Sequence, residues 1–289
     1  MSETKFLSFD TWWGGLNNIR MTYELVGALS VLTGRKIILP PKIYCLFLSE
    51  HQRKSSFFDF WTLFDKDAFT EQFDCVEYNE IKKYKKFNTK VQYFDNICQD
   101  IKCIPNADHP NWGPGLDILQ SKLSKEDLDT NDTYIHFPRN LFGHWYHLLP
   151  VENEEQKALI KRKLKNGLKL KSKYDFKPFK DPYNAIHVRS GDFKFTRTTS
   201  TETLFNNLRT LVDKYITPTK PLYIATDEKD RSKFECLNGY NCFYLEDFRD
   251  VDQVAAIAMD TLACTNAEEF YGSRYSTFTD YINILRHYR

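Results

Sequence analysis

The chain has 289 residues, of which 42% are hydrophobic and 27% charged, with eleven glycines and eleven prolines. This length and composition exclude disordered and fibrous classes and leave room for two ordinary domains or one large one. Forty basic residues against thirty-nine acidic ones give a formal net charge of +1, so no global field draws the protein to nucleic acid or an anionic membrane. Any anion must therefore be bound locally, and we expect no nucleic-acid partner.

The beginning of the sequence shows no targeting segment. Residues 1–6 run directly into a strand-like segment, and no apolar stretch approaches the roughly eighteen residues that a membrane span needs. The seven cysteines are odd in number and have no CxxC spacing, which favours reduced thiols. We expect a cytoplasmic protein without a membrane span, or one of the secretory-pathway lumen if the sequence is a truncated form.

A β-loop-α-β unit opens the chain. Residues 5–9 predict a strand, and after a short loop the apolar spacing of residues 16–33 predicts a long helix that Gly34 ends. Residues 36–39, closed by two prolines, predict a second, buried strand. This order is typical of the opening of a parallel α/β sheet.

The middle of the chain, about residues 42–150, is aromatic-rich and irregular. Periodicity decides little there. The short apolar runs at residues 55–60 and 133–137 are either strands or loop anchors.

The predicted domain boundary follows a helix at about residues 152–168. The basic run at residues 161–173 has helical spacing, which favours a solvated helix face or linker over a binding patch. A polar linker with two prolines comes next. We expect an N-terminal Rossmann-like domain at residues 1–175 and a C-terminal one at residues 176–289.

Strands and helices alternate clearly in the second half. The predicted elements are a strand at 184–189, a helix at 202–215, strands at 222–225 and 242–245, a helix at 251–264, a strand at 269–271 and a helix at 277–288. This alternation predicts a second doubly wound sheet, and ligands of such sheets bind beyond the carboxyl ends of the strands. The residues that follow each strand are therefore the most informative.

The loop after the first predicted strand contains Gly14, Gly15 and Asn17. Two glycines let the backbone approach a ligand, and the helix that follows presents free N–H groups to an anion. The alternative is an ordinary glycine turn before a helix.

The strand at residues 184–189 ends in a guanidinium group. Alternation places His187 and Arg189 on one face, and an unpaired buried arginine is costly, so both side chains are candidates to point into a cleft. The alternative is a structural ion pair between Arg189 and Asp192.

Two further candidates lie near the end of the chain. Asp260 stands in a run of small apolar residues; a buried carboxylate needs donors, and the Watson–Crick edge of guanine offers two adjacent N–H groups. Alternatively, Asp260 faces solvent on an amphipathic helix. Ser276, Thr277 and Phe278 begin the last predicted helix, where a hydroxyl-rich start is either an N-cap or a phosphate cradle.

Metal ligation is the weaker interpretation of three short motifs. Of the two DxD triplets, residues 65–67 lie in the aromatic-rich region and residues 250–252 begin a predicted helix, where acids favour the macrodipole. His144 and His147 fit a packing or acceptor-cleft element better than a metal site. We expect no metal.

The candidate sites together resemble the motifs of the GDP-fucose O-fucosyltransferase superfamily, including its plant members. The matching blocks are residues 14–20 (GGLNNIR), residues 186–192 (IHVRSGD), Asp260 and residues 270–286 (FYGSRYSTFTDYINILR), in the family's order. The resemblance implies an α/β fold of the GT-B type, with two facing Rossmann-like domains and a cleft between them. It also implies inversion of the anomeric centre without a metal or cofactor.

The resemblance implies a role for each site residue. Arg189 would contact the β-phosphate, Asp260 would read the guanine, and Asn17 would lie near the transferred sugar. The residues implied to bind the nucleotide sugar are Gly14, Gly15, Asn17, His187, Arg189, Asp260, Ser276, Thr277 and Phe278. The implied catalytic residues are Arg189, Asn17 and Asp192.

No general base is carried over from the family. Some relatives have a carboxylate just before the glycine-asparagine turn, where this chain has Trp12 and Trp13. Asp10 and Asp192 are possible bases, but an oxocarbenium-like transition state needs little base assistance.

The sequence thus predicts an inverting, metal-independent transferase that moves fucose from GDP-fucose to a hydroxyl of a glycan or protein acceptor. A guanidinium and helix N-terminal amides would stabilise the departing diphosphate in place of a cation. The alternatives are a related transferase that uses another donor, such as UDP-xylose, and an inactive module that binds a nucleotide or glycan on the same fold.

Overall fold

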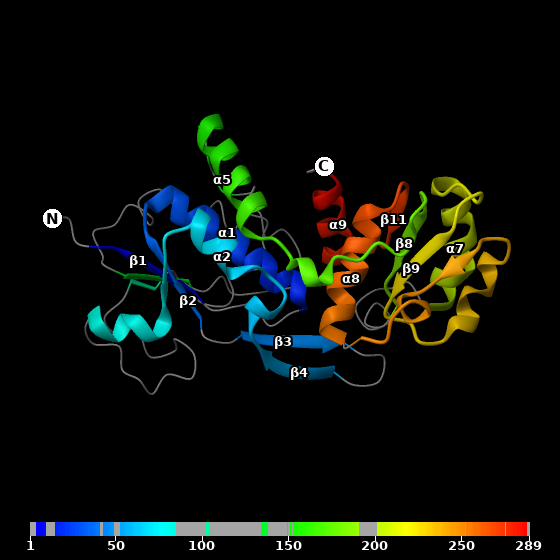
Figure 1. The fold of residues 1–289 in the computed structure, drawn as a ribbon, viewed down its shortest axis with the longest axis horizontal. Helices are drawn as coiled ribbons and strands as arrows, with labels where there is room; N and C mark the ends of the chain where they lie inside the picture. Colours follow the sequence, from blue (N-terminus) through cyan, green and yellow to red (C-terminus); the bar gives the residue numbers. More distant parts are fainter. Residues whose placement is uncertain are drawn as a thin grey trace. The chain divides into compact units, whose positions relative to one another are not determined.

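The computed structural model describes residues 4–9, 15–40, 43–48, 53–84, 102–103, 134–137, 149, 151, 153–190, 201–251, 253–274 and 276–287. The chain divides into two compact units (Figure 1). Unit 1 comprises Met1–Leu46 and Ser55–Lys169, and unit 2 comprises Phe47–Lys54 and Leu170–Arg289. Within the described ranges, no helix has the length and apolarity needed to cross a membrane.

Unit 1 is built on a five-stranded sheet in the order β5-β2-β1-β7-β6, in which every neighbouring pair is parallel. Its strands are β1 (Phe6–Phe9), β2 (Lys36–Leu39), β5 (Cys75–Glu77), β6 (Lys102–Cys103) and β7 (Tyr134–Phe137). Its helices are α1 (Leu16–Thr33), α2 (Lys66–Gln72) and α5 (Glu154–Gly167). Strands β1, β2 and β5 advance to one edge of the sheet. The chain then forms β6 at the opposite edge, and β7 pairs between β6 and β1, so the strand order reverses between β1 and β7.

The opening β1-α1-β2 unit confirms the prediction from hydrophobic spacing. α1 ends at Gly34, which has φ 65° and donates its backbone N–H to the Ser30 carbonyl. This left-handed conformation favours glycine, which explains why the helix ends there. Aromatic side chains fill much of the core of unit 1; Tyr23 of α1 stacks on Phe60 with ring centroids 3.9 Å apart.

The aromatic-rich middle contains regular elements that periodicity did not resolve. Strands β3 (Ile43–Leu48) and β4 (Arg53–Phe58) pair in a separate two-stranded sheet, so the run at residues 55–60 begins as a strand. The run at residues 133–137 is β7. α2 begins at an N-cap, Asp65, whose Oδ1 accepts the Ala68 N–H at 3.1 Å, so this carboxylate of the first DxD triplet has a structural role.

Unit 2 is built on a four-stranded parallel sheet in the order β10-β9-β8-β11. Its strands are β8 (Asn184–Val188), β9 (Leu222–Thr226), β10 (Cys242–Phe243) and β11 (Phe270–Gly272). Its helices are α7 (Thr201–Tyr215), α8 (Gln253–Asn266) and α9 (Thr277–His287). The elements confirm the predicted alternation, except that β10 ends earlier than expected because Leu245 begins a 3₁₀ turn over Leu245–Asp247.

Helices cover both faces of this sheet, as Figure 1 shows. Ile186 and Ile224 face α7 in one hydrophobic core, whereas Ala185 and Tyr223 face α8 and α9 in the other. This is the doubly wound arrangement that the alternation predicted. The boundary between residues 175 and 176, the acceptor and donor roles of the two domains, and the facing arrangement with its cleft stay predictions.

The strand order of unit 2 also reverses at one point. The chain runs from β8 to β9 to β10, and β11 then pairs with the opposite side of β8. In an open α/β sheet such a reversal opens a crevice at the carboxyl ends of the two strands, where ligands bind. The segments that follow β8 and β11 are therefore the place to look for a site.

Candidate functional site

The carboxyl ends of β8 and β11 are tied together by polar contacts. Arg189, partly buried, follows β8 directly, and its backbone N–H donates to Ser273 Oγ at 2.9 Å. Ser273, just after β11, donates its own N–H to the His187 carbonyl at 2.9 Å. The backbone that carries the predicted anion-binding arginine is thus fixed against the neighbouring strand.

His187 lies beside the first turn of α9. It is 8% exposed, its Nδ1 lies 2.8 Å from Thr279 Oγ1, and its ring centroid lies 4.6 Å from that of Phe278. Burial, with a smaller effect of the nearby Arg189 charge, lowers the pKa of His187 to about 3. The imidazole is therefore neutral near pH 7, so Arg189 supplies positive charge here and His187 only hydrogen bonds.

Gly272 allows α9 to approach the sheet this closely. It pairs in register with His187, and a Cβ added at this position would lie 2.5 Å from both Cγ2 and Oγ1 of Thr279. Any larger residue would push Thr279 away from His187. Sequence analysis did not assign a role to Gly272 or Thr279, because only the strand register and the approach of α9 bring them together.

The hydroxyl of Ser276 is a buried polar group that the described part of the protein leaves without a hydrogen-bond partner. Ser276 is 0% exposed, and its carbonyl accepts the Asp280 N–H at 3.0 Å, as an N-cap residue's does. Capping by the carbonyl explains why this residue begins the helix, but it gives the hydroxyl no partner. An unpaired buried hydroxyl costs about 1–3 kcal/mol. A ligand oxygen at the start of α9 would satisfy it. Thr277 and Phe278, which follow, are partly buried.

Asp260 of α8 accepts one hydrogen bond from the described residues. The hydroxyl of Tyr223, a fully buried residue of β9, donates to Asp260 Oδ1 at 2.6 Å. Burial raises the pKa of Asp260 to about 7. Asp260 is partly buried, and its Oδ2 accepts no hydrogen bond from any described residue.

Gly15 and Asn17 occupy the corresponding position in unit 1, after β1 and beside the reversal of strand order. Gly15 is the N-cap of α1, with φ −69° and no side-chain capping bond. A Cβ there would have no described atom within 4 Å, so nothing described in the protein requires glycine. Asn17 is buried, with 7% exposure.

The structure thus brings His187, Arg189, Phe278 and the start of α9 together at the β8/β11 reversal. Several predicted residues lie outside the described ranges: Asp10, Gly14, His144, His147 and Asp192. Within those ranges, no three or more His, Cys, Asp or Glu side chains are grouped so as to hold a metal ion.

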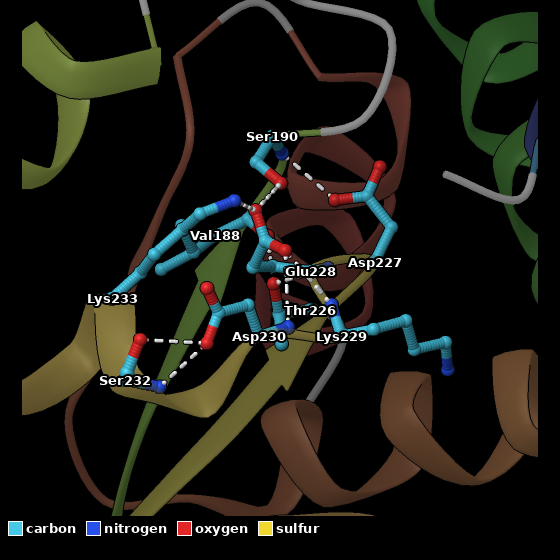
Figure 2. A network of polar contacts seen from close by, with 9 residues as sticks. All are labelled: Val188, Ser190, Thr226, Asp227, Glu228, Lys229, Asp230, Ser232 and Lys233. Carbon is cyan, nitrogen blue, oxygen red and sulfur yellow. Dashed lines mark hydrogen bonds and ion pairs between the residues drawn. The ribbon is translucent and has the colours of Figure 1, made fainter. Parts of the chain in front are cut away.

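Sequence analysis missed two acidic residues that follow β9. Ser190 donates its N–H to Asp227 Oδ1 at 2.7 Å and its hydroxyl to Glu228 Oε2 at 3.1 Å (Figure 2). The rule that residues after strands carry function applies to β9 as well as to β8. That rule would have selected both carboxylates.

Two units with parallel sheets of Rossmann type, each with a reversal of strand order, are the components of a GT-B fold. No family model matches the sequence, and neither does any curated protein. Solved structures do match. POFUT1 in complex with GDP-fucose is 13% identical, with 98% of this chain and 94% of that chain covered and a TM-score of 0.53.

A second group of similar structures is NodZ α-1,6-fucosyltransferase. The crystal soaked with GDP-fucose is 13% identical, with 98% of this chain and 93% of that chain covered and a TM-score of 0.56. For the NodZ fucosyltransferase from Bradyrhizobium, the identity is 12%, the coverage 98% and 94%, and the TM-score 0.52. These matches confirm the α/β fold of two Rossmann-like domains and, at the level of the fold, the resemblance to GDP-fucose fucosyltransferases.

Proposed function

We propose that the chain is an inverting, metal-independent glycosyltransferase that transfers fucose from GDP-fucose to a hydroxyl of a glycan or protein acceptor. The observation that carries this proposal is the group formed by Arg189, neutral His187 and the unpartnered hydroxyl of Ser276 around the β8/β11 reversal. Crystals of the similar POFUT1 and NodZ contain GDP-fucose or were soaked with it. The donor is proposed for this chain on that basis.

The residues of unit 2 suit the departure of a diphosphate. Breaking the bond between sugar and phosphate develops negative charge on the leaving diphosphate, and preorganised donors stabilise that charge more than solvent does. Arg189 supplies a guanidinium for the β-phosphate. The first turn of α9 adds its free N–H groups and the Ser276 hydroxyl, so this account needs no metal.

Asp260 is the proposed reader of the guanine. An ionised carboxylate accepts the two adjacent N–H groups of the guanine edge. No described residue donates to Oδ2 of Asp260, so this oxygen can accept from a guanine. Because the pKa of Asp260 is about 7, guanine also supplies the donors that would stabilise the charged form. A uracil base does not offer this pair of donors.

The acceptor side of the proposal rests on the family resemblance. Asn17 would lie near the transferred sugar, and Gly14 and Gly15 would let the backbone approach it. Asp10 and Asp192 are the proposed candidates for a general base, although an oxocarbenium-like transition state reduces the need for one.

A thermal-shift titration tests the proposal. The purified protein is titrated with GDP, UDP, ADP and GDP-fucose, with and without a chelator, because a ligand at a hundred times its Kd stabilises the folded state by about 2.7 kcal/mol. We expect stabilisation by GDP and GDP-fucose alone, unchanged by the chelator.

The alternatives give different outcomes. Stabilisation by UDP instead would favour a UDP-sugar donor, and stabilisation only with a divalent cation would contradict the metal-free mechanism. Binding of GDP-fucose without transfer to any acceptor and without release of GDP by hydrolysis would identify an inactive binding module.

A further inference from the structure

The backbone that leaves β8 is held from both sides. On the β11 side, the Arg189 N–H donates to Ser273 Oγ at 2.9 Å. On the β9 side, the next N–H, that of Ser190, donates to Asp227 Oδ1 at 2.7 Å. Two successive N–H groups are thus bound by side chains from the two neighbouring strands, which fixes the path of the chain at the arginine.

Glu228 is the centre of the contacts on the β9 side, as Figure 2 shows. Its side chain is 1% exposed. Oε2 accepts the Ser190 hydroxyl at 3.1 Å and pairs with Lys233 Nζ at 2.6 Å. Oε1 accepts the backbone N–H groups of Lys229 at 3.0 Å and Asp230 at 3.1 Å. Both oxygens of this buried carboxylate therefore have donors.

Thr226, the last residue of β9, adds a second connection to β8. Its hydroxyl donates to the Val188 carbonyl at 2.7 Å and accepts the Glu228 N–H at 3.1 Å. The turn that carries Glu228 is therefore itself fixed to the end of β8. The Ser190 hydroxyl is held by a group that has little freedom to move.

A carboxylate so near a proposed anion site needs its charge balanced. Lys233 provides a positive charge for Glu228, and the two backbone N–H groups add partial positive charge. The ion pair, in which Glu228 is buried and Lys233 partly exposed, therefore balances the charge of Glu228. This arrangement suits a support for a cationic group better than it suits a phosphate ligand.

We propose that Glu228 is a positioning residue that, through the Ser190 hydroxyl, fixes the backbone at Arg189 and so directs its guanidinium toward the β-phosphate of the nucleotide. This inference rests on the proposed function, because it assumes a guanine nucleotide at this site. Preorganisation of this kind raises affinity by reducing the freedom lost on binding. Its effect is confined to the part of the affinity that the β-phosphate contributes.

The substitution Ser190→Ala tests the inference with little change in shape. It removes the hydroxyl bond to Glu228 and leaves the Ser190 N–H bond to Asp227. Ser232→Ala is the control, because the Ser232 hydroxyl donates to Asp230 Oδ1 at 2.7 Å on the exposed side of the same network without contacting Ser190. Calorimetric titration of each protein with GDP and GMP gives the ratio of the two Kd values, which reports the contribution of the β-phosphate.

We expect Ser190→Ala to lower the ratio of the GMP Kd to the GDP Kd by about tenfold. This is the change in affinity that corresponds to the free energy of about one hydrogen bond. Ser232→Ala should leave the ratio unchanged. Glu228→Gln should lower the ratio less, because its amide can still form a hydrogen bond with the Ser190 hydroxyl but no longer forms an ion pair with Lys233. Combining it with Ser190→Ala should add little, because both changes act on the same contact. If Ser190 had a purely structural role, Ser190→Ala would lower the melting temperature or weaken the binding of GDP and GMP equally.

The outcomes separate this inference from the proposed function. If the unmodified protein binds neither GDP nor GMP, the proposed function fails and the inference fails with it. If the unmodified protein prefers GDP and Ser190→Ala keeps the full preference, the inference is overturned and the proposed function stands. Should Glu228→Gln fail to fold, the comparison of Ser190→Ala with Ser232→Ala still decides.

Discussion

Both units contain a reversal of strand order, but the residues at the two reversals differ in their chemistry. In unit 2, the ends of β8 and β11 and the start of α9 carry the Arg189 guanidinium, the neutral His187 imidazole and the buried Ser276 hydroxyl. Side chains fix their surroundings: the Arg189 backbone N–H donates to Ser273 Oγ, and His187 contacts Thr279 Oγ1. In unit 1, the segment after β1 enters α1 through Gly15, a helix start with no side-chain cap. Topology therefore determines where a ligand can bind in each sheet, and the residues determine which ligand.

This difference indicates which groups each unit would contribute to the proposed reaction. Charge and donors suited to a diphosphate are concentrated in unit 2, whereas unit 1 offers the start of α1 and the buried Asn17. Five predictions test the comparison, beginning with the largest expected effects on turnover and donor binding.

The largest effect is expected for Arg189→Ala. Removing the guanidinium leaves the charge on the departing diphosphate without its main protein partner, so GDP release from GDP-fucose should slow by about a hundredfold or more. Arg209→Ala serves as control, because Arg209 lies exposed on α7 and pairs with Asp213. Full turnover in a folded Arg189→Ala protein would remove Arg189 from the mechanism.

The next effect is on base recognition by Asp260. Asp260→Asn should weaken GDP binding by about ten- to a hundredfold, the range for hydrogen bonds to a charged group. The substitution should weaken the binding of IDP less, because IDP lacks the exocyclic amine of guanine. Competition titrations with the two nucleotides measure the difference, and equal losses for both would contradict guanine reading.

The same substitution has a separate effect on stability. The Asp260 pKa is about 7 in the folded protein against 3.8 without burial. Between these pH values the folded state holds a proton that the unfolded chain has lost, so this residue lowers stability as pH rises through the window. Asp260→Asn has no carboxylate to titrate and should fold. Measured against the unmodified protein, its free energy of unfolding should compare more favourably at pH 8 than at pH 4.

A pair of glycine substitutions compares the two reversals directly. Gly272→Ala places a Cβ against Thr279 and should lower the free energy of unfolding by about 1–3 kcal/mol. Gly15→Ala meets no described atom and should cost less than about 1 kcal/mol, yet weaken GDP-fucose binding. Urea unfolding and donor titration of both variants check this. Equal destabilisation would mean that both glycines serve packing alone.

The last prediction concerns the stability of the protein in acid and its dependence on His187. The unfolded imidazole takes up a proton near pH 6.5 and the folded one only at about 3, so the folded state binds fewer protons and stability falls as pH drops through that window. His187→Asn, which can still reach Thr279, should flatten this fall, whereas His287→Asn at the exposed end of α9 should not. Urea unfolding between pH 7 and pH 4 measures both slopes.

The sequence predicted most of unit 2 and the opening of unit 1, because strands such as Asn184–Val188 and helices such as α1 have apolar spacing that requires burial. It did not predict α2 or β5, because these elements contain too few residues for a helical or strand period to be recognised. His187, Arg189 and Ser276 could be selected as candidates because each lies at or next to the end of a clearly predicted strand or helix.

Other site residues depended on three-dimensional packing. Thr279 matters because Gly272 lets α9 approach β8, and Tyr223 matters because it reaches Asp260 across two elements. Neither contact follows from spacing along the chain. Glu228, by contrast, lies in the short segment after a predicted strand and could have been selected by the rule that selected Arg189.

The most direct test of the account is a crystal structure of the protein with bound GDP. The account predicts the diphosphate at the carboxyl ends of β8 and β11, with the β-phosphate on Arg189, an oxygen on the Ser276 hydroxyl and the guanine edge on Asp260. GDP bound elsewhere, or with its diphosphate away from Arg189 and the start of α9, would contradict the central claim that the β8/β11 reversal is the donor site.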